Sequence, residues 1–341
     1  MPIQYSGVVD EYQTVRTQAG LFDVSHMGRI LVSGTGAEPF LQRVTTNDLA
    51  GLKPGQAQYS MVCNEQGGIK DDIFVYRLER PGEFLLCVNA SNRAKILAWL
   101  FSQGQGVSDC RIQDRSTEMA QIALQGPAAR SIVEALGLTA LAQLKLRQST
   151  KVQVGGVECL IARTGYTGEF GYEFYVTGAV PMVWDALMGA GKAFGLKPAG
   201  LGARDLLRLE MGYLLYGSDI DERTTPLEAG VDWAVSFSKG VFLGKPVLEQ
   251  QRQAGPERRF IGFELLEKGV PRHGFTMLSS TSEPIGEVTS GNLSPLLQKG
   301  IGLGYVRSDF AKPGTDILID IRGKQVPAKV VKPPFYTRPT K

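Results

Sequence analysis

The sequence predicts an α+β fold, with two related α+β units followed by a small C-terminal module that is β-barrel-like. Helical and strand-like patterns alternate along the first part of the chain, and this order partly returns near residue 120. From about residue 256 the pattern changes to short strands separated by glycine and proline turns. A length of 341 residues accommodates two or three domains at about 150 residues each.

The first unit should begin with two amphipathic helices and a set of strands. The helices are expected over residues 8–19 and 36–48, and the strands lie in 21–34, 59–64, 71–78 and 83–89. A tight turn over 79–83 makes the last two strands a hairpin, and a helix over 92–104 follows. The positions expected to face inward on the two amphipathic helices are Val8, Tyr12, Val15, Phe40, Leu41 and Val44.

The second unit partly repeats this order. A strand over 121–126 precedes a helix over 127–137, which has a proline near its start and a glycine at its end. Two strands flank a glycine-rich turn within 157–176. Further helices are expected over 180–195 and 199–217, and in the second of these Arg204 and Arg208 lie four residues apart on one face.

The domain boundary is expected near residues 251–259, a polar and glycine-containing stretch that is typical of a linker. Residues 1–255 hold the two α+β units, interleaved as roughly 1–30 with 116–255 and as 31–115. Residues 256–341 form an all-β domain, with strands expected over 258–266, 285–291, 299–306, 315–323 and 324–332.

The composition argues against several classes of protein. The net charge is +3 and the basic residues form no long run, so no nucleic-acid partner is expected. No stretch approaches the roughly 20 apolar residues of a membrane helix, so no membrane partner is expected either. The four cysteines lie far apart without a CxxC pair, which favours reduced, buried thiols and a cytoplasmic location.

The chain has only two histidines, His26 and His273. A histidine-rich metal site and an HExxH helix are therefore excluded, and no GxSxG pattern supports a serine hydrolase. The strings GLGARD and GIGLGYV do not match GxGxxG, and VFLGKPVL lacks the Ser or Thr of a phosphate loop. We expect neither a metal nor a nucleotide cofactor.

Two adjacent acids, Asp71 and Asp72, begin the strand that follows a Gly-Gly turn. Alternation places Asp72 on one face with Phe74 and Tyr76, and Asp71 on the aliphatic face. An aromatic face suits a flat ligand, so Asp72 is the stronger candidate and Asp71 is interpreted as a turn or packing residue. The alternative is that both acids are solvated and the aromatic side chains belong to the core.

The hairpin brings an amide close to Asp72. If Leu78 faces Phe84 across the turn, Ile73 faces Asn89, and Asp72 lies within about one residue of the same level. A carboxylate and an amide together can hold a polar ring or steer a proton.

A second candidate acid, Glu173, follows the glycine-rich turn RTGYTGEFGYEF. It lies inside an aromatic strand, where a carboxylate needs a partner such as an arginine or a pair of ligand N–H groups. A structural salt bridge is the alternative.

Several stretches together resemble the T-protein family of the glycine cleavage system, and they run in order along the whole chain. They are AGLFDVSHMG, TTNDLAGLKPGQAQYSM, NEQGGIKDDIFVY, ALQGP, RTGYTGEFGYEFYV, PAGLGARDLLRLEMGYLLYGSDIDERTTPLEAG, GEVTSGNLSP and KPPFYTR. The resemblance implies a three-domain cloverleaf with tetrahydrofolate bound in a central channel. The implied activity moves the methylene of an aminomethyl group from the lipoylated H-protein to tetrahydrofolate, with release of ammonia.

The resemblance also assigns the site. The family's key carboxylate falls on Asp72, its pterin-binding glutamate on Glu173 and the arginine of its GLGARD-like motif on Arg204. The residues expected to line the folate site or to lie near it are Tyr59, Asn89, Tyr166, Met27, Tyr76, Tyr213, Tyr336 and Arg338. Tetrahydrofolate would act as co-substrate, and the family's chemistry requires no metal.

Three alternatives belong to other members of the fold. The iron–sulfur-assembly relatives carry KGCYxGQE, whereas SKGVFLGKPVL here has Val241 in place of the cysteine. A tetrahydrofolate-dependent demethylase or methyltransferase acting on a small molecule would share the fold, as would a non-catalytic folate-binding paralogue. Family members usually carry a further segment ahead of MPIQY, so we expect either a start assigned too far downstream or a shortened relative.

Overall fold

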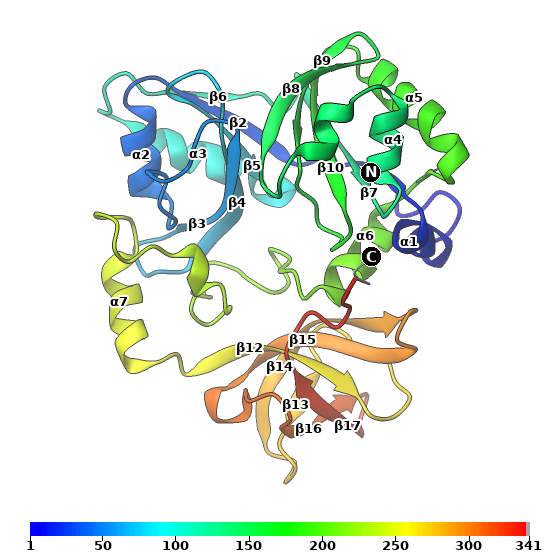
Figure 1. Ribbon diagram of the computed structural model, residues 1–341. Coiled ribbons are helices and arrows are strands. Elements are labelled where there is room, and N and C mark those ends of the chain that lie inside the picture. The colour runs from blue at the N-terminus through cyan, green and yellow to red at the C-terminus, as the bar shows by residue number, and fades with distance from the viewer. Residues whose placement is uncertain (339–341) are drawn as a thin grey trace. The chain divides into compact units, whose positions relative to one another are not determined.

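The computed structural model describes residues 1–338, and it divides into two compact units (Figure 1). The first unit contains Met1–Val62, Lys70–Arg204 and Ser238–Leu243. The second contains Cys63–Ile69, Asp205–Phe237 and the chain from Gly244 onward.

A six-stranded sheet in the first unit has the order β11-β1-β7-β10-β9-β8. Its strands are β1 (Gly20–Asp23), β7 (Met119–Gln125), β8 (Ser149–Val154), β9 (Val157–Ala162), β10 (Gly171–Thr177) and β11 (Lys197–Pro198). The helices α4 (Ala129–Ala135) and α5 (Val180–Gly191) lie against it (Figure 1). Their buried side chains, among them Ile132 and Leu187, share one core with Leu124 and Phe174 of the sheet.

The helix α1 (Val8–Thr17) precedes this sheet and buries Tyr12 and Val15, as its sequence pattern predicts. Its Glu11 is fully buried, and one carboxylate oxygen accepts the backbone N–H of Gly200 at 2.7 Å. The start of α6 (Leu201–Glu210) is thereby held against α1.

A five-stranded sheet, also centred in the first unit, has the order β3-β4-β5-β2-β6. Its strands are β2 (Gly28–Ser33), β3 (Gln56–Cys63), β4 (Ile69–Arg77), β5 (Glu83–Val88) and β6 (Arg111–Asp114). The helices α2 (Ala37–Val44) and α3 (Arg93–Gly104) supply Phe40, Leu41, Val44 and Leu100 to its core. Burying such side chains contributes about 1.5–3 kcal/mol each.

The observed register of the β4–β5 hairpin differs from the predicted register by one residue. Arg77, not Leu78, is paired with Phe84. The N–H of Leu78 donates to the carbonyl of Glu83 at 3.0 Å, so Leu78 belongs to the turn, which Gly82 completes at a φ of 73°. Continued along β4, this register places Asn89 opposite Asp72 rather than opposite Ile73.

The second unit contains a closed six-stranded barrel with the order β12-β15-β14-β13-β16-β17. Its strands are β12 (Arg258–Leu265), β13 (Thr276–Leu278), β14 (Pro284–Ser294), β15 (Lys299–Arg307), β16 (Asp316–Ile321) and β17 (Lys324–Val331). Alternate residues fill its interior, including Phe263, Met277 and Ile319. Closure leaves no free sheet edge, which is how small barrels avoid edge pairing.

The fold class is confirmed as α+β with a C-terminal barrel, but sequence patterns missed some elements. These are the short strands β6, β8, β11 and β13 and the helix α7 (Lys245–Ala254). The single strand expected within residues 21–34 is two strands, β1 and β2, which belong to different sheets. Helix α6 ends at Glu210, well before the predicted residue 217, because Gly212 takes a φ of 67° and its N–H bonds back to Leu209. Single 3-10 turns occupy Ala90–Asn92, Thr139–Gln143, Lys192–Phe194, Asp232–Ala234 and Ser308–Phe310. The predicted division at residue 255 stays a prediction.

Candidate active site

Asp72 lies near the start of β4 and is held by two neighbours. The hydroxyl of Tyr59 donates to its Oδ2 at 2.8 Å, and the Nδ2 of Asn89 donates to its Oδ1 at 2.7 Å. Burial and the charge of Asp72 raise the pKa of Tyr59 well above its usual value, so the phenol remains a donor. The Asp72 carboxylate is half-buried, and both of its oxygens accept hydrogen bonds.

Asp71 points to the other face of β4 and is fully buried. It accepts hydrogen bonds from the backbone N–H of Asn89 at 3.1 Å and from the Nδ2 of Asn92 at 2.6 Å. Burial and the neighbouring Asp72 raise the pKa of Asp71 to about 7, although these amide donors act in the opposite direction. The predicted alternation is correct, and the interpretation of Asp71 as a turn or packing residue stays a prediction.

The face that Asp72 shares is aromatic, as predicted. The Tyr59 and Phe74 ring centroids lie 5.5 Å apart, and those of Phe74 and Tyr76 lie 6.2 Å apart. The Tyr76 ring then meets Tyr175 of the six-stranded sheet edge-on at 5.3 Å. An apolar cluster containing Tyr76, Tyr175 and Met27 thus joins the two sheets of the first unit.

Glu173 lies on β10 with 8% of its surface exposed. Its Oε1 accepts from the Nε2 of Gln121 at 3.0 Å, and its Oε2 accepts the Thr164 hydroxyl. These are neutral donors rather than the arginine that a structural salt bridge requires. A carboxylate has about four acceptor positions, so both oxygens retain capacity for a ligand.

The glycine-rich turn before Glu173 needs its glycines for two different reasons. Gly168 has a φ of 80°, where a side chain would strain the backbone. A Cβ on Gly165 or Gly171 would lie 2.0 Å or 2.4 Å from the side-chain amide of Gln125. The turn therefore packs tightly against Gln125.

Arg204 and Tyr166 come together in the first unit. The guanidinium carbon of Arg204 lies 4.6 Å from the centroid of the Tyr166 ring, within cation–π distance. Arg208, on the next turn of α6, instead binds Asp219 in a buried ion pair of the second unit at 2.7 Å.

Three predicted site residues belong to the second unit, which is described separately. Tyr213 is 37% exposed, the backbone N–H of Tyr336 donates to the carbonyl of Glu210 at 3.2 Å, and Arg338 is exposed. Their predicted place near the folate stays a prediction.

The sequence did not single out four residues that support the predicted site: Gln121, Thr164, Tyr175 and Arg29. The Tyr175 hydroxyl donates to that of Tyr76 at 2.9 Å and accepts from Gln121 at 3.3 Å. Arg29 is fully buried, and its guanidinium donates to the carbonyl oxygens of Met27 and Ser116. Polar residues inside otherwise apolar strands were the available signal for Gln121, Tyr175 and Arg29, whereas Thr164 lies after the end of β9.

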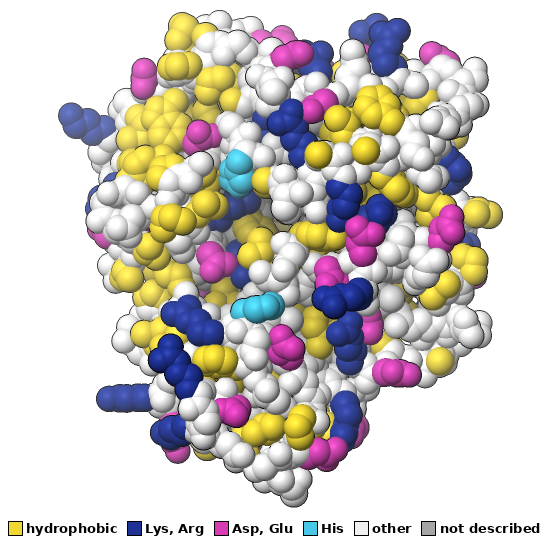
Figure 2. Space-filling model, turned by 180° about the vertical axis from the view of Figure 1, so that it is seen from behind, with side chains coloured by type: hydrophobic (Ala, Val, Ile, Leu, Met, Phe, Trp, Pro, Cys, Tyr) yellow, Lys and Arg dark blue, Asp and Glu magenta, His cyan; other side chains and the backbone are white. Residues whose placement is uncertain are grey.

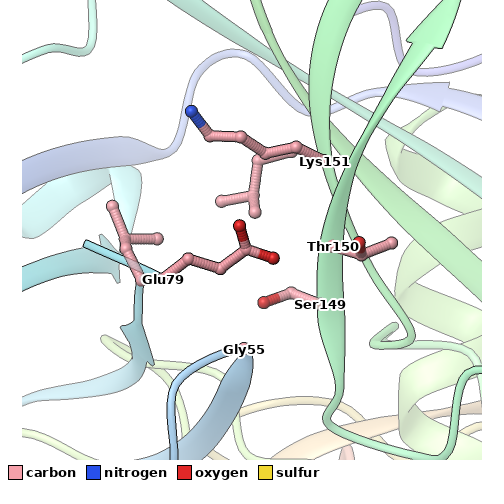
Figure 3. A pocket seen from close by; sticks show the side chains of 7 residues that line it. Gly55, Glu79, Ser149, Thr150 and Lys151 are labelled. Atoms are coloured by element: carbon pink, nitrogen blue, oxygen red, sulfur yellow. The ribbon is translucent and has the colours of Figure 1, made fainter. Parts of the chain in front are cut away.

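A small hollow elsewhere in the first unit is lined by none of these residues. It lies between the turn of the β4–β5 hairpin and strands β8 and β9, and Figure 3 shows Gly55, Glu79, Ser149, Thr150 and Lys151 around it. Lys151 forms an exposed ion pair with Glu158 at 3.2 Å.

Acidic and basic side chains are interspersed over the face drawn in Figure 2. None of the helices within residues 1–338 has the length and apolar character needed to cross a bilayer. In the same range, no group of three or more metal-binding side chains was found.

Comparison with known proteins places the chain in a family. The family model described as "GCVT N-terminal domain" matches residues 1–239. The family model described as "Glycine cleavage T-protein C-terminal barrel domain" matches residues 258–337. The chain therefore belongs to the T-protein family of the glycine cleavage system.

Individual relatives define the enzyme class. An aminomethyltransferase of Halothermothrix orenii is 48% identical over 98% of this chain and 93% of its own length. One of Bacteroides thetaiotaomicron is 46% identical with the same coverage. The crystal structure of the aminomethyltransferase T from Bartonella henselae covers 99% of this chain and 92% of its own, at 34% identity and a TM-score of 0.92. The chain is thus an enzyme of the aminomethyltransferase class.

Proposed function

We propose that this enzyme transfers the methylene of an aminomethyl group, carried on the lipoyl arm of the H-protein, to tetrahydrofolate. The carbon loses its bonds to the amino nitrogen and the lipoyl sulfur and gains bonds to N5 and N10 of the folate. The two folate N–H protons leave on ammonia and on the dihydrolipoyl thiol. The observation that carries the proposal is Asp72, a carboxylate fixed by Tyr59 and Asn89 on an aromatic face, in a chain of this family.

Asp72 is the proposed catalytic residue. As the amino group departs, the carbon becomes iminium-like and positive, and a fixed anion nearby stabilises that charge more than it stabilises the ground state. The hydrogen bonds from Tyr59 and Asn89 set the carboxylate in place before the reaction, so little reorganisation is needed. Proton transfer by Asp72 is a further proposed task.

Glu173 is the proposed pterin-binding residue. A pterin presents an N–H and an amino group side by side, and a carboxylate accepts such a pair with both oxygens. Gln121 and Thr164 already orient one oxygen each. We propose Tyr59, Asn89, Tyr166 and Arg204 as further folate or substrate contacts, with Met27, Tyr76, Tyr213, Tyr336 and Arg338 nearby.

The proposed partners are tetrahydrofolate and the lipoylated H-protein, and the proposed location is the cytoplasm. Support for the location comes from the cysteines, which are all free and three of which are buried. Burial raises the pKa of Cys63 to about 12, which keeps that thiol unreactive at neutral pH.

The test is turnover with purified components. Wild-type enzyme is mixed with aminomethylated H-protein and tetrahydrofolate, and ammonia and 5,10-methylenetetrahydrofolate are measured. Parallel reactions replace the H-protein with small methyl donors such as dimethylsulfoniopropionate. Tetrahydrofolate binding is measured separately by calorimetry.

Equal yields of ammonia and methylenetetrahydrofolate that require the aminomethylated H-protein are expected. Normal folate binding without that turnover rejects the proposal. Methyl transfer from a small donor would then indicate a demethylase, and binding alone would indicate a non-catalytic paralogue.

A further inference from the structure

The proposed reaction gives no task to Asp71, yet its surroundings are unusual. It is a fully buried carboxylate on the face of β4 that it shares with Ile73 and Val75. Its donors are all amide groups: the backbone and side chain of Asn89, at 3.1 Å and 2.8 Å, and the side chain of Asn92 at 2.6 Å. A buried carboxylate whose partners are all neutral is costly to keep ionised.

The side chain of Asn89 connects the two acids. Its Nδ2 lies 2.8 Å from the Oδ1 of Asp71 and 2.7 Å from the Oδ1 of Asp72. The backbone carbonyl of Asp72 lies 3.1 Å from the same nitrogen. Because all three of these atoms are acceptors, the orientation of the amide is determined, and its oxygen is the end left for a ligand donor.

Two carboxylates that share one amide nitrogen lie close together, and like charges in proximity disfavour full ionisation. The groups around Asp71 are Asp72 on its own strand and the neutral amides of Asn89 and Asn92. The Tyr59 phenol from β3 donates to Asp72 and interacts with Asp71 electrostatically. Asp72 is half-buried and accepts the Tyr59 hydroxyl, whereas Asp71 is fully enclosed. The enclosed acid is therefore the one that retains a proton.

We propose that Asp71 is a positioning residue for the Asp72 site: it fixes the Asn89 amide against Asp72 and takes the proton of the pair, leaving Asp72 ionised. This inference rests on the proposed function, because Asp72 is its catalytic residue. The raised pKa of Asp71, about 7, agrees with that division. Burial is its largest cause, and repulsion from Asp72 follows.

The first experiment locates the proton shared between Asp71 and Asp72, and it does not require catalytic turnover. The side-chain amide resonances of Asn89 are followed by NMR from pH 5 to pH 9 in wild type and in Asp71→Asn. Wild type should titrate with a midpoint near pH 7, and the variant should lose that transition. Asp185→Asn, which changes an exposed acid on α5, is the matched control and should titrate as wild type does.

The second experiment measures kcat and KM for tetrahydrofolate across the same pH range. Asp71→Asn imitates the protonated acid, so it should keep most of the wild-type kcat/KM below pH 7 while losing the pH dependence near 7. Asp71→Ala removes the carboxylate that accepts hydrogen bonds from Asn89. Because the Asn89 amide would then be misplaced, kcat/KM should fall at every pH, on the order of 100-fold. Unfolding curves establish that both variants fold.

Each of the two experiments can contradict the inference without the other. An Asn89 signal that is flat near pH 7 in wild type, or one that still titrates in Asp71→Asn, overturns the inference even if the enzyme is inactive. If wild type is active and Asp71→Ala changes only stability, with the wild-type pH profile intact, Asp71 is a packing residue. Absence of turnover by wild type counts against the proposed function, and the NMR titration still decides the place of the proton.

Discussion

The carboxylate of Glu173 is buried, yet it can still accept hydrogen bonds from a ligand. Gln121 and Thr164 each donate one hydrogen bond to it, which holds both oxygens in place without neutralising the charge. An arginine partner would have bound both oxygens at once and competed with a ligand. The neutral partners favour a binding role over a structural salt bridge.

Glu173→Gln should therefore weaken tetrahydrofolate binding. Hydrogen bonds to a charged group are worth about 1.5–3 kcal/mol, so the dissociation constant should rise about 10- to 100-fold. Calorimetric titration measures it. Asp185→Asn, which changes an exposed acid on α5 outside the proposed site, is the control. An equal loss of tetrahydrofolate affinity in both variants would contradict a specific binding role for Glu173.

Asp71 should make stability depend on pH. Its pKa is raised in the folded state to about 7, whereas in the unfolded chain it ionises near its usual value of about 3.9. The unfolded state therefore releases this proton first, and the free energy of unfolding falls as pH rises between these two values. In Asp71→Asn this fall should be smaller when urea unfolding is compared at pH 5 and pH 8. A variant with the wild-type slope would show that Asp71 does not titrate in this way.

At the residue scale, strand alternation was sufficient to separate Asp72 from Asp71, and the structure agrees with that separation. Strand alternation cannot predict the free-energy cost of burying a carboxylate, because that cost depends on hydrogen-bond partners that are distant in sequence. Asn92 reaches Asp71 from a turn that follows β5, and Gln121 reaches Glu173 from β7. Neither contact follows from local spacing.

At the element scale, helices with a clear apolar face were predictable, and α1, α2 and α3 lie where the pattern placed them. The hairpin register was wrong by one residue, because a turn of five residues and one that includes Leu78 look alike in sequence. Short strands such as β6 and β13 carry too few residues for a pattern of period two to stand out.

Helix α3 offers a test of how its packing stabilises the five-stranded sheet. Leu100 is 1% exposed and lies in the core, whereas its neighbour Phe101 is 50% exposed. Leu100→Ala should lower the free energy of unfolding by about 2–5 kcal/mol, and Phe101→Ala should change it by about 0.5 kcal/mol or less. Urea unfolding followed by circular dichroism measures both. Similar losses in the two variants would contradict the assigned face of α3.

At the scale of the whole molecule, composition limited the possible functions while the ordered motifs indicated the family. Two histidines and scattered cysteines argued against metal and hydrolase chemistry without pointing to any reaction. The resemblance along the whole chain did point to one, and both family models, the relatives and the barrel agree with it. The predicted site lies beyond what composition can predict, because its residues come from strands of two sheets, a turn and helix α6.

The measurement that tests the central claim most directly is the turnover of Asp72→Asn beside wild type, with aminomethylated H-protein and tetrahydrofolate. Loss of the fixed anion should lower kcat by about 100-fold or more, with folate binding and the unfolding midpoint close to wild type and with Asp185→Asn fully active. Undiminished release of ammonia and formation of methylenetetrahydrofolate by Asp72→Asn would contradict the role assigned to this carboxylate.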